Sequence, residues 1–197
     1  MAFNINEFKS LGLTGGGARP SLFKVQITPN IGEDRDASLK FEFTCRATEI
    51  PAATVDSIPV PYFGRTIKLA GDRTFADWSV TVMNDEDYLV RNMFEDWSNK
   101  INQFVDNRKI LVNNEYKNSD ALVTHFSKDG SVIRAYNFVG IFPVSISNMA
   151  MDWDNTNAIQ TFDVTFAYDY WVPVQIGALD IIDTGERGDV GFLRAPR

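Results

Sequence analysis

A stretch in the middle of the chain changes its apolar period from two to about three and a half. Apolar residues alternate with smaller or polar ones over residues 78–83, which predicts a half-buried β-strand. Further on, they recur three and four positions apart and predict an amphipathic helix, with Leu89, Val90, Met93, Phe94, Trp97 and Ile101 on one stripe. Asn84, followed by three carboxylates, predicts the N-cap of that helix. We therefore expect one helix packed on one sheet, with Trp78 and Trp97 as the main contacts.

Alternation of apolar and polar residues predicts further strands on both sides of this element. They are Leu22–Thr28, Leu39–Arg46, Leu122–Ser127, Val132–Phe138, Val144–Met149 and one strand in residues 159–171. The Asp129-Gly130 pair between two of these strands is typical of a β-hairpin turn. Six or seven strands with one helix predict a mainly β fold, a β-sandwich or barrel-like domain with one flanking α-helix.

Three regions are expected along the chain. Residues 1–20 predict an N-terminal arm with a flexible triple glycine, residues 21–171 the β domain, and residues 172–197 a C-terminal extension. Within the β domain, residues 50–72 carry three prolines, which cannot donate to a strand ladder, so they predict an excursion or an edge element. This segment is too apolar for a solvated loop. We expect it to lie against its own core or against another subunit.

Composition restricts the class of protein. The formal net charge is −7 and the pI about 4.7, which argues against a protein that grips nucleic acid. The single cysteine, Cys45, excludes an intrachain disulfide and is expected to be a buried small hydrophobe. No apolar run approaches the ~20 residues that a membrane-spanning helix needs, and the N-terminus has no pattern of a secretory signal.

No motif in the sequence indicates catalysis or a cofactor. The only histidine, His125, lies on an expected strand without a nucleophile motif. The DWDNTN segment has the carboxylates of a calcium loop but places Asn157 where such loops need glycine and Asp163 where they need glutamate. The carboxylates at 85–87 are better explained by the start of the helix than by a catalytic pair. We expect no catalytic residue, no metal ion and no cofactor, and hence no enzyme.

Several motifs resemble a known family in order and spacing. GDRTFADWSVTVMNDED, the IPA…IPV segment before it, MDWDNTNAIQTF from Met151 and the overlapping IQTFDVTFAYDYW resemble the tail tube proteins of T-even-like contractile-tailed bacteriophages. The resemblance runs from Ala18 to Trp171 and departs from the family around residues 32–38 and in residues 172–197. It implies a fold shared with the tube subunits of type VI secretion systems and contractile pyocins.

The resemblance also implies a function and partners. Such proteins form hexameric rings that stack into a hollow conduit inside a contractile sheath. They hold the tape-measure protein, grow from the baseplate and pass DNA into the host without binding it specifically. The expected location is the virion, after assembly in the host cytoplasm.

Two groups of residues are expected to serve the assembly. The polar side of the main strands would face the watery lumen, which assigns Glu42, Thr44, Asp163, Thr165 and Asp169 to the bore. The apolar excursion would contact other subunits, which assigns to that contact Pro59, Val60, Tyr62, Phe63, Arg65, Ile67, Leu69 and Asp72.

Other functions remain open at this point. A cap, tail terminator or baseplate component of the same fold would start or end a tube. A carbohydrate-binding β-sandwich would use aromatic side chains as a sugar platform, although most of them alternate inward on strands. A hydrolase is the weakest alternative, because no nucleophile–base pair is present. Assembly into rings would separate a tube subunit from a sugar-binding module.

Overall fold

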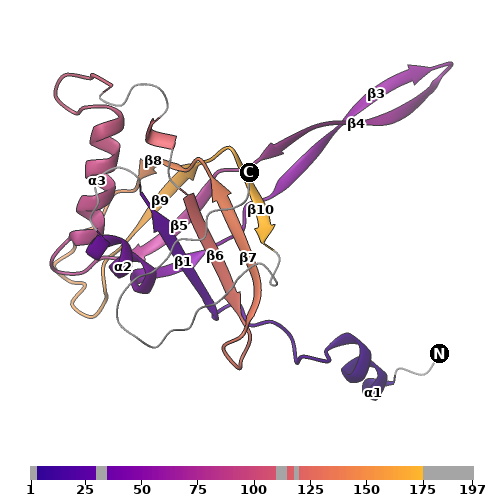
Figure 1. Ribbon diagram of the computed structural model, residues 1–197, viewed down its shortest axis with the longest axis horizontal. Helices are drawn as coiled ribbons and strands as arrows, with labels where there is room; N and C mark the ends of the chain where they lie inside the picture. The colour runs from indigo at the N-terminus through magenta and orange to yellow at the C-terminus, as the bar shows by residue number, and fades with distance from the viewer. Residues whose placement is uncertain (1–3, 30–34, 110–114, 118–119, 175–197) are drawn as a thin grey trace.

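The computed structural model describes residues 4–29, 35–109, 115–117 and 120–174, and these residues form a mainly β sandwich (Figure 1). One antiparallel sheet, sheet A, has the order β1-β6-β7-β10, and the other, sheet B, has the order β2-β5-β9-β8. Sheet A consists of β1 (Phe23–Thr28), β6 (Asp120–Phe126), β7 (Val132–Val139) and β10 (Tyr170–Val174). Sheet B consists of β2 (Cys45–Thr48), β5 (Trp78–Met83), β9 (Thr161–Ala167) and β8 (Phe142–Ile146).

The core lies between the two sheets, where aromatic side chains meet. Trp78 of sheet B stacks on Phe138 of sheet A with ring centroids 4.5 Å apart, and its other neighbour is Phe166 at 5.3 Å. On β5 the buried residues alternate with half-buried ones, as the period of two predicts. The β-sandwich prediction is confirmed, and so is the burial of Trp78 and Trp97, which are both fully buried.

The amphipathic helix is confirmed as α3 (Leu89–Ile101), which buries Val90, Met93, Phe94 and Trp97. It begins four residues later than an N-cap at Asn84 predicts, because Tyr88 occupies the N-cap position. The side chain of Asn84 donates to Gln160 Oε1 over 2.9 Å, and the Leu89 N–H donates to Asp87 Oδ1 over 3.1 Å. The expected N-cap at Asn84 is therefore wrong, because that side chain ties the end of β5 to the segment before β9 while a carboxylate satisfies the first helical N–H.

The expected strand Leu39–Arg46 is also wrong. Residues Arg35–Thr44 form a second helix, α2, and only Cys45–Thr48 is a strand. One turn apart, Ala37 and Phe41 are fully buried, and Phe41 meets Phe94 of α3 edge to face at 5.6 Å. Phe43, assigned to the same face as Phe41 by the period of two, is 80% exposed. Packing on α3 and β1 decides this segment, since short apolar runs fit either period.

The C-terminal strand signal belongs to two strands in different sheets. β9 pairs with β5 and β8, and β10 pairs with β7, so the chain crosses from sheet B to sheet A around Asp169. β10 also continues past the expected domain boundary at residue 171. β8 begins two residues before the expected Val144–Met149 strand and lies in the other sheet from β7. The β6–β7 hairpin is confirmed, with Gly130 at a φ of 85° in its turn.

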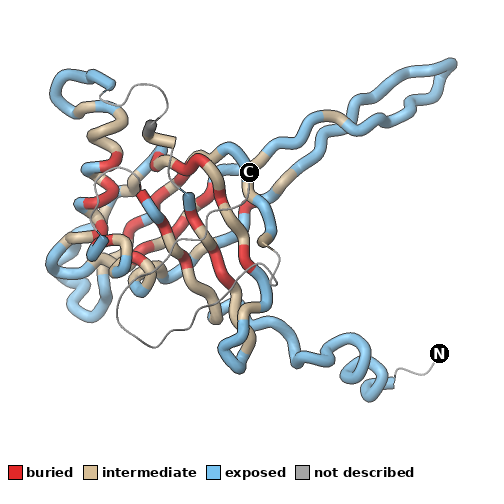
Figure 2. Tube along the Cα trace, in the orientation of Figure 1, coloured by how far each residue is buried: buried red, intermediate tan, exposed pale blue. Residues whose placement is uncertain are grey.

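Two segments project from the sandwich (Figures 1 and 2). One is the hairpin of β3 (Ala53–Tyr62) and β4 (Arg65–Phe75), and the other is the N-terminal arm with α1 (Ile5–Glu7) and a π-helical turn, η1 (Phe8–Gly12). A short 3-10 turn, η2 (Glu115–Lys117), completes the described elements. Within the described ranges, no helix is long and apolar enough to cross a membrane. Most of the C-terminal extension, residues 175–197, lies outside these ranges.

Candidate assembly surface

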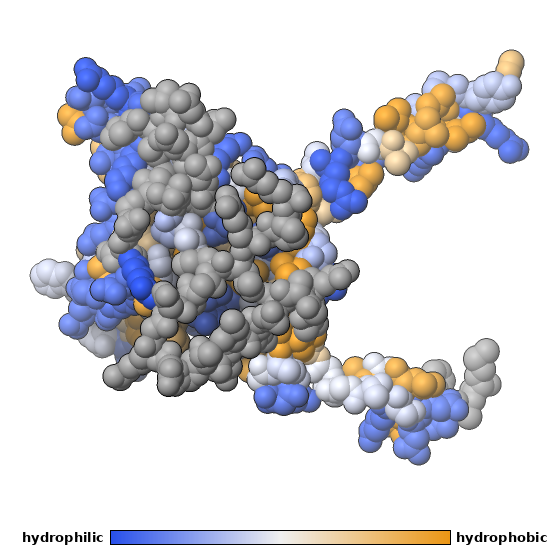
Figure 3. Space-filling model, in the orientation of Figure 1, coloured by the Kyte–Doolittle hydropathy of each residue, from blue (hydrophilic) through white to orange (hydrophobic). Residues whose placement is uncertain are grey.

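The β3–β4 hairpin is a two-stranded ribbon with an apolar face that the described chain does not cover. Its register pairs Ile58 with Leu69, Val60 with Ile67, and Tyr62 with Arg65. Residues two apart on a strand share a face, so these six side chains lie on one side of the ribbon. The four aliphatic side chains of this face are all exposed, namely Ile58, Val60, Ile67 and Leu69. Figure 3 shows hydrophobic surface along this projection.

The turn at the tip of the hairpin is strained. It consists of Phe63 and Gly64, with φ angles of 41° and 80°. Two positive φ angles in a two-residue loop are typical of a type I′ turn, which favours asparagine or glycine at its first position. A bulky residue in this conformation is an outlier. Phe63 is nevertheless 91% exposed, and among the described residues its ring contacts one other aromatic ring, that of Tyr62, with centroids 4.7 Å apart. The tip thus presents an aromatic pair at a conformational cost.

The root of the hairpin is held by residues that follow β9. Tyr168 Oη donates to the carbonyl of Ala76 over 2.6 Å, and Trp171 Nε1 donates to the carbonyl of Pro51 over 3.2 Å. Both rings also contact Phe75, with centroids 6.1 and 6.0 Å away. Burial raises the pKa of Tyr168 to about 12, so its hydroxyl keeps its proton and remains a donor. These contacts fix where the two hairpin strands leave the sandwich.

The residues assigned from sequence to inter-subunit contact all lie on this hairpin or its turn. Val60, Tyr62, Arg65, Ile67 and Leu69 are on its apolar face. Pro59 lies on the opposite face, across from Lys68, and Asp72 lies beside the bulge where the register shifts between Val55 and Ser57. Their contact with another subunit stays a prediction. Sequence reasoning missed the root residues Tyr168 and Trp171, whose strand alternation made them look like part of one continuous strand.

The residues assigned to the lumen are divided by the fold. Asp163 and Thr165 lie on β9, on the face of sheet B that points away from the core, where Thr81 Oγ1 donates to Asp163 Oδ1 over 2.6 Å. Asp169 lies between β9 and β10 and pairs with Lys117 Nζ at 2.8 Å. The outer face of β5 and β9 therefore carries small polar side chains along most of its length, with Met83 and Ala167 near the ends of the two strands.

The argument that assigned Glu42 and Thr44 to the lumen no longer holds. Both lie on α2 rather than on a strand. The Glu42 carboxylate pairs with Lys24 and is almost completely buried, and Thr44 Oγ1 donates to the carbonyl of Lys40 over 3.0 Å. Their side chains are engaged in attaching α2 to β1 and in closing the last turn of the helix.

The described residues hold no arrangement that suggests catalysis. No group of three or more metal-ligating side chains occurs among them. His125 Nε2 is 2.7 Å from the carbonyl of Arg19, which ties β6 to the base of the arm. Burial raises the pKa of the Cys45 thiol to about 12, so it carries little thiolate at neutral pH. The half-buried Cys45 packs against the core, as expected for a small hydrophobe.

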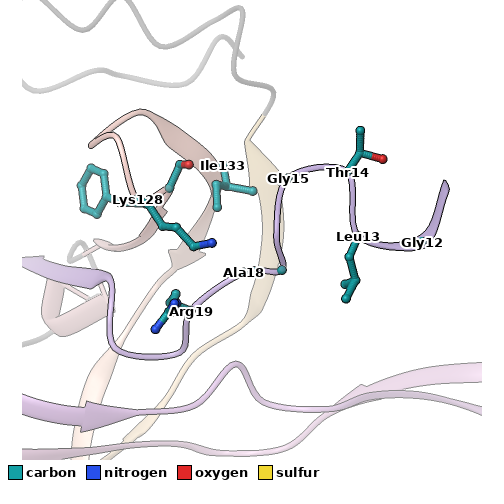
Figure 4. A pocket seen from close by; sticks show the side chains of 11 residues that line it. Gly12, Leu13, Thr14, Gly15, Ala18, Arg19, Lys128 and Ile133 are labelled. Atoms are coloured by element: carbon teal, nitrogen blue, oxygen red, sulfur yellow. The ribbon is translucent and has the colours of Figure 1, made fainter. Parts of the chain in front are cut away.

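A pocket of about 470 Å³ lies between the arm and the β6–β7 turn (Figure 4). Its walls are formed by residues 12–15 and 17–19 of the arm, together with residues 126–128 and Ile133. Lys128 Nζ reaches across it and donates to the carbonyl of Gly16 over 3.3 Å. The pocket is thus the space between the base of the projecting arm and the β6–β7 turn, and its lining contains no acidic residue.

The family model described as phage tail tube protein matches residues 18–174. The chain belongs to this family. Tail tube protein gp19 of Enterobacteria phage T4 is 40% identical over 163 residues, which cover 80% of this chain and 93% of that protein. The tail tube protein of Serratia phage KSP90 is 24% identical over 166 residues, 83% of this chain and 93% of that protein. The chain is therefore a structural protein of the phage tail tube and not an enzyme.

Solved structures with low identity share the fold. A chain in the six-fold symmetrised cryo-EM structure of the anti-feeding prophage baseplate has a TM-score of 0.61 at 11% identity, covering 81% of this chain and 97% of that one. A chain in the PVC sheath-tube complex in the extended state has a TM-score of 0.52 at 14% identity, covering 88% and 99%. The sequence prediction of the family and of a tube-protein fold is confirmed.

Proposed function

We propose that copies of this chain form six-membered rings that stack into a hollow conduit inside a contractile sheath. The conduit grows from the baseplate, holds the tape-measure protein and passes DNA into the host. Assembly takes place in the host cytoplasm, and the finished tube is part of the virion. The observation that carries this proposal is the projecting hairpin with its uncovered apolar face, on a chain of the tail tube family.

The hairpin supports assembly because it cannot be explained by the monomer. A two-stranded ribbon alone is marginally stable in water and gains stability when a hydrophobic face packs against something. Contiguous exposed apolar surface on soluble proteins marks interaction sites. Pro59 and Pro61 on β3 remove two N–H donors, which hinders uncontrolled addition of a further strand. The ribbon is therefore suited to a specific packing contact through its face.

The sheets supply a second argument for rings. In the described chain, β1 and β10 end sheet A, and β2 and β8 end sheet B. Strands with a free edge pair readily with other chains unless a structure covers them. A closed ring allows each edge to meet a neighbouring subunit, and closed symmetry is usual for self-assembling proteins. A six-membered ring agrees with the six-fold symmetry stated for the similar baseplate structure.

The outer face of sheet B is our candidate for the wall of the bore. Its two central strands, β5 and β9, present Thr81, Asp163 and Thr165, whereas the edge strand β2 carries the exposed cation Arg46. DNA binding gains much of its affinity from the release of counterions by lysine and arginine. The hydroxyls and carboxylate on β5 and β9 lack that gain, so DNA would slide along these two strands.

Electron microscopy of the purified full chain tests the ring and the tube directly. We expect six-fold rings or hollow rods of uniform bore, either in the concentrated protein or after addition of baseplates as nuclei. A protein that stays monomeric under both conditions would contradict the proposal.

Deletion of Pro59–Asp72 tests the hairpin. Because Val55 and Arg73 pair across the base of the ribbon, the deletion leaves residues 56–58 as a short loop. We expect a folded monomer with an unchanged unfolding midpoint that no longer forms rods. Rods formed as readily as by the unmodified chain would show that this segment is not an assembly contact.

Asp163→Lys tests the bore, and a phage carrying it is the appropriate sample. We expect tubes of normal length with slower DNA ejection, because a lysine in the wall would bind phosphate. Asp106→Lys, on the exposed segment after α3, is the matched control with the same change of charge. Ejection at the unmodified rate in Asp163→Lys would refute the assignment of this face.

A tube terminator or cap is the second candidate function. The anti-feeding prophage cap and the PVC sheath/tube terminator have similar TM-scores of 0.58 and 0.60, so the fold alone does not separate these roles. The relatives at 40% identity are tail tube proteins, which favours the tube. Long rods in the microscope would exclude a terminator, whereas single rings would favour it.

A further inference from the structure

The hairpin and a second exposed segment leave sheet B at opposite ends. The hairpin joins β2 to the start of β5, at Trp78, which pairs with Phe166. Residues 147–160, which we name the Trp153 loop, join β8 to the start of β9 at Thr161, which pairs with Met83 at the far end of β5. Figure 1 shows the hairpin projecting at the upper right and this loop, in light orange, at the lower left.

The Trp153 loop exposes apolar side chains that its own chain does not cover. Trp153 is 98% exposed, Met151 77% and Ile159 69%. The loop is nevertheless ordered by a tight turn, in which the Asp154 N–H donates to Asp152 Oδ1 over 3.0 Å. Asn84 and Tyr88 hold its far end through Gln160 Oε1, at 2.9 and 3.3 Å. It therefore presents an indole ring between two carboxylates from a fixed base.

The two segments carry opposite charges. Residues 58–69 of the hairpin contain Arg65 and Lys68 and no acidic residue, a net charge of +2. The Trp153 loop contains Asp152 and Asp154 and no basic residue, a net charge of −2. Within the described residues, none of these four side chains forms an ion pair in the monomer. Both segments thus combine exposed aromatic rings with charge that lacks an intrachain counterpart.

We infer that the hairpin tip of one subunit packs on the Trp153 loop of another copy of this chain. Tyr62 and Phe63 lie against Trp153, while Arg65, on the same face of the ribbon as Tyr62, faces Asp152 and Asp154. Because the two surfaces lie at opposite ends of one sheet, the contact is head to tail and repeats from copy to copy. This inference rests on the proposed tube and adds to it the surface that receives the hairpin.

The two contributions to this contact have different roles. Aromatic and aliphatic groups supply the buried area, and tyrosine, tryptophan and arginine are the residues that carry most of the binding energy in interfaces. The opposite charges fix orientation and exclude the reverse pairing, since two hairpin tips or two Trp153 loops would bring like charges together. The same chemistry therefore gives the stack one polarity.

Charge exchange between the two segments is the first test. Arg65→Glu and Asp154→Lys are each expected to raise the protein concentration needed for rod formation by about tenfold or more, because each brings like charges together. The double variant restores the opposite signs and is expected to recover rods. Asp106→Lys is the control, because it reverses a charge elsewhere on the surface. Single variants that assemble like this control, or a double variant that does not recover, would overturn the pairing.

Cross-linking of assembled rods is the second test and does not depend on lost assembly. Thr66→Cys combined with Asn155→Cys places one thiol beside each surface while keeping both aromatic groups and all four charges. With a short bismaleimide, we expect a ladder of multimers on a denaturing gel, because every chain carries both halves of the contact. Each single variant should give at most dimers, and Thr66→Cys with Val105→Cys should give no ladder. Native Cys45 has little thiolate and does not interfere.

The outcomes separate this inference from the proposed function. Rods that form normally but give no ladder with the Thr66 and Asn155 pair would overturn the contact and leave the tube intact. Charge variants that form rods but fail to bind sheath protein would assign the Trp153 loop to the sheath instead. If the unmodified chain forms neither rings nor rods, the proposed function fails and the inference fails with it.

Discussion

The sandwich and the β3–β4 hairpin use the same kinds of apolar residue with opposite results. Trp78 on β5 is fully buried between the sheets, whereas Phe63 at the hairpin tip is almost fully exposed. Trp78 lies on a regular strand and Phe63 in a strained two-residue turn, but neither local conformation decides whether the side chain is covered. The difference lies in what covers them. Sheet A covers Trp78 within one chain, while the hairpin has no second layer in the described monomer.

This contrast separates residues that make the subunit from residues that join subunits. A sandwich whose core is complete folds without help from neighbours. The hairpin gains its second layer only when another copy supplies it. Changes in the first region should therefore act on the free energy of unfolding, and changes in the second on assembly. The following variants test that division.

Trp78→Ala should have the largest effect on stability. Its ring fills the space between Phe138 and Phe166, and its indole N–H donates to Thr48 Oγ1 over 2.9 Å. Loss of a buried aromatic side chain costs about 3–5 kcal/mol of unfolding free energy. We expect a similar loss for Trp97→Ala. Chemical denaturation followed by circular dichroism measures both, and an unchanged midpoint would contradict the helix-on-sheet core.

Tyr168→Phe should have an intermediate effect, because it lies where the two regions meet. The change keeps the ring against Phe75 and removes only the hydrogen bond to the Ala76 carbonyl. A bond of this kind contributes about 0.5–1.5 kcal/mol. We expect that loss in denaturation, together with weaker rod formation, since the root that fixes the hairpin is loosened. Full stability with normal rods would show that this hydroxyl does not hold the root.

Lys40→Met should give a smaller effect that depends on pH. Lys40 donates to Asp85 and Asp87, and these hydrogen bonds lower the pKa of both carboxyls below the ordinary value of 3.8. A carboxyl whose pKa is lowered by folding stabilises the fold at pH values above its ordinary pKa. That contribution is lost as the pH falls through the pKa of the folded state. We therefore expect the free energy of unfolding to be larger for the unmodified chain than for the variant at pH 7, and the two values to converge in acid. A difference that persists below both pKa values would contradict this cause.

Phe63→Asn should have almost no effect on stability. Asparagine before Gly64 suits the type I′ turn, and an exposed side chain contributes within ±0.5 kcal/mol. The variant is nevertheless expected to form rods poorly, since the tip loses its aromatic ring. Denaturation and electron microscopy of the same sample provide the comparison. A marked loss of stability would place Phe63 in the subunit's own structure, against the division drawn above.

Much of the fold follows from local patterns. The period of two on β5 and on β1, the hairpin turn at Asp129-Gly130 and the apolar stripe of α3 each predict their element correctly. Arg91 and Glu95 on α3 also pair at 2.6 Å, as their spacing of one turn allows. These predictions are correct because each element depends mainly on residues that are close together in the sequence.

The errors occur where distant residues decide. The segment that contains Phe41 alternates like a strand, but Phe94 of α3 receives its ring and the segment becomes α2. Asn84 has the side chain of a helix cap, but Gln160 takes its hydrogen bond. The lumen assignment of Glu42 and Thr44 followed from the first of these errors.

The sequence by itself determined a mainly β subunit of the tail tube family, the helix at residues 89–101 and an apolar excursion in need of a partner. Only the tertiary structure decided that this excursion is a two-stranded ribbon with one apolar face. The same structure shows that Tyr168 and Trp171 hold its root and that it lies at the opposite end of sheet B from the Trp153 loop. The reason is physical. Periodicity and turn chemistry act over a few residues, whereas the direction of the ribbon depends on contacts about 90 to 120 positions apart in the chain.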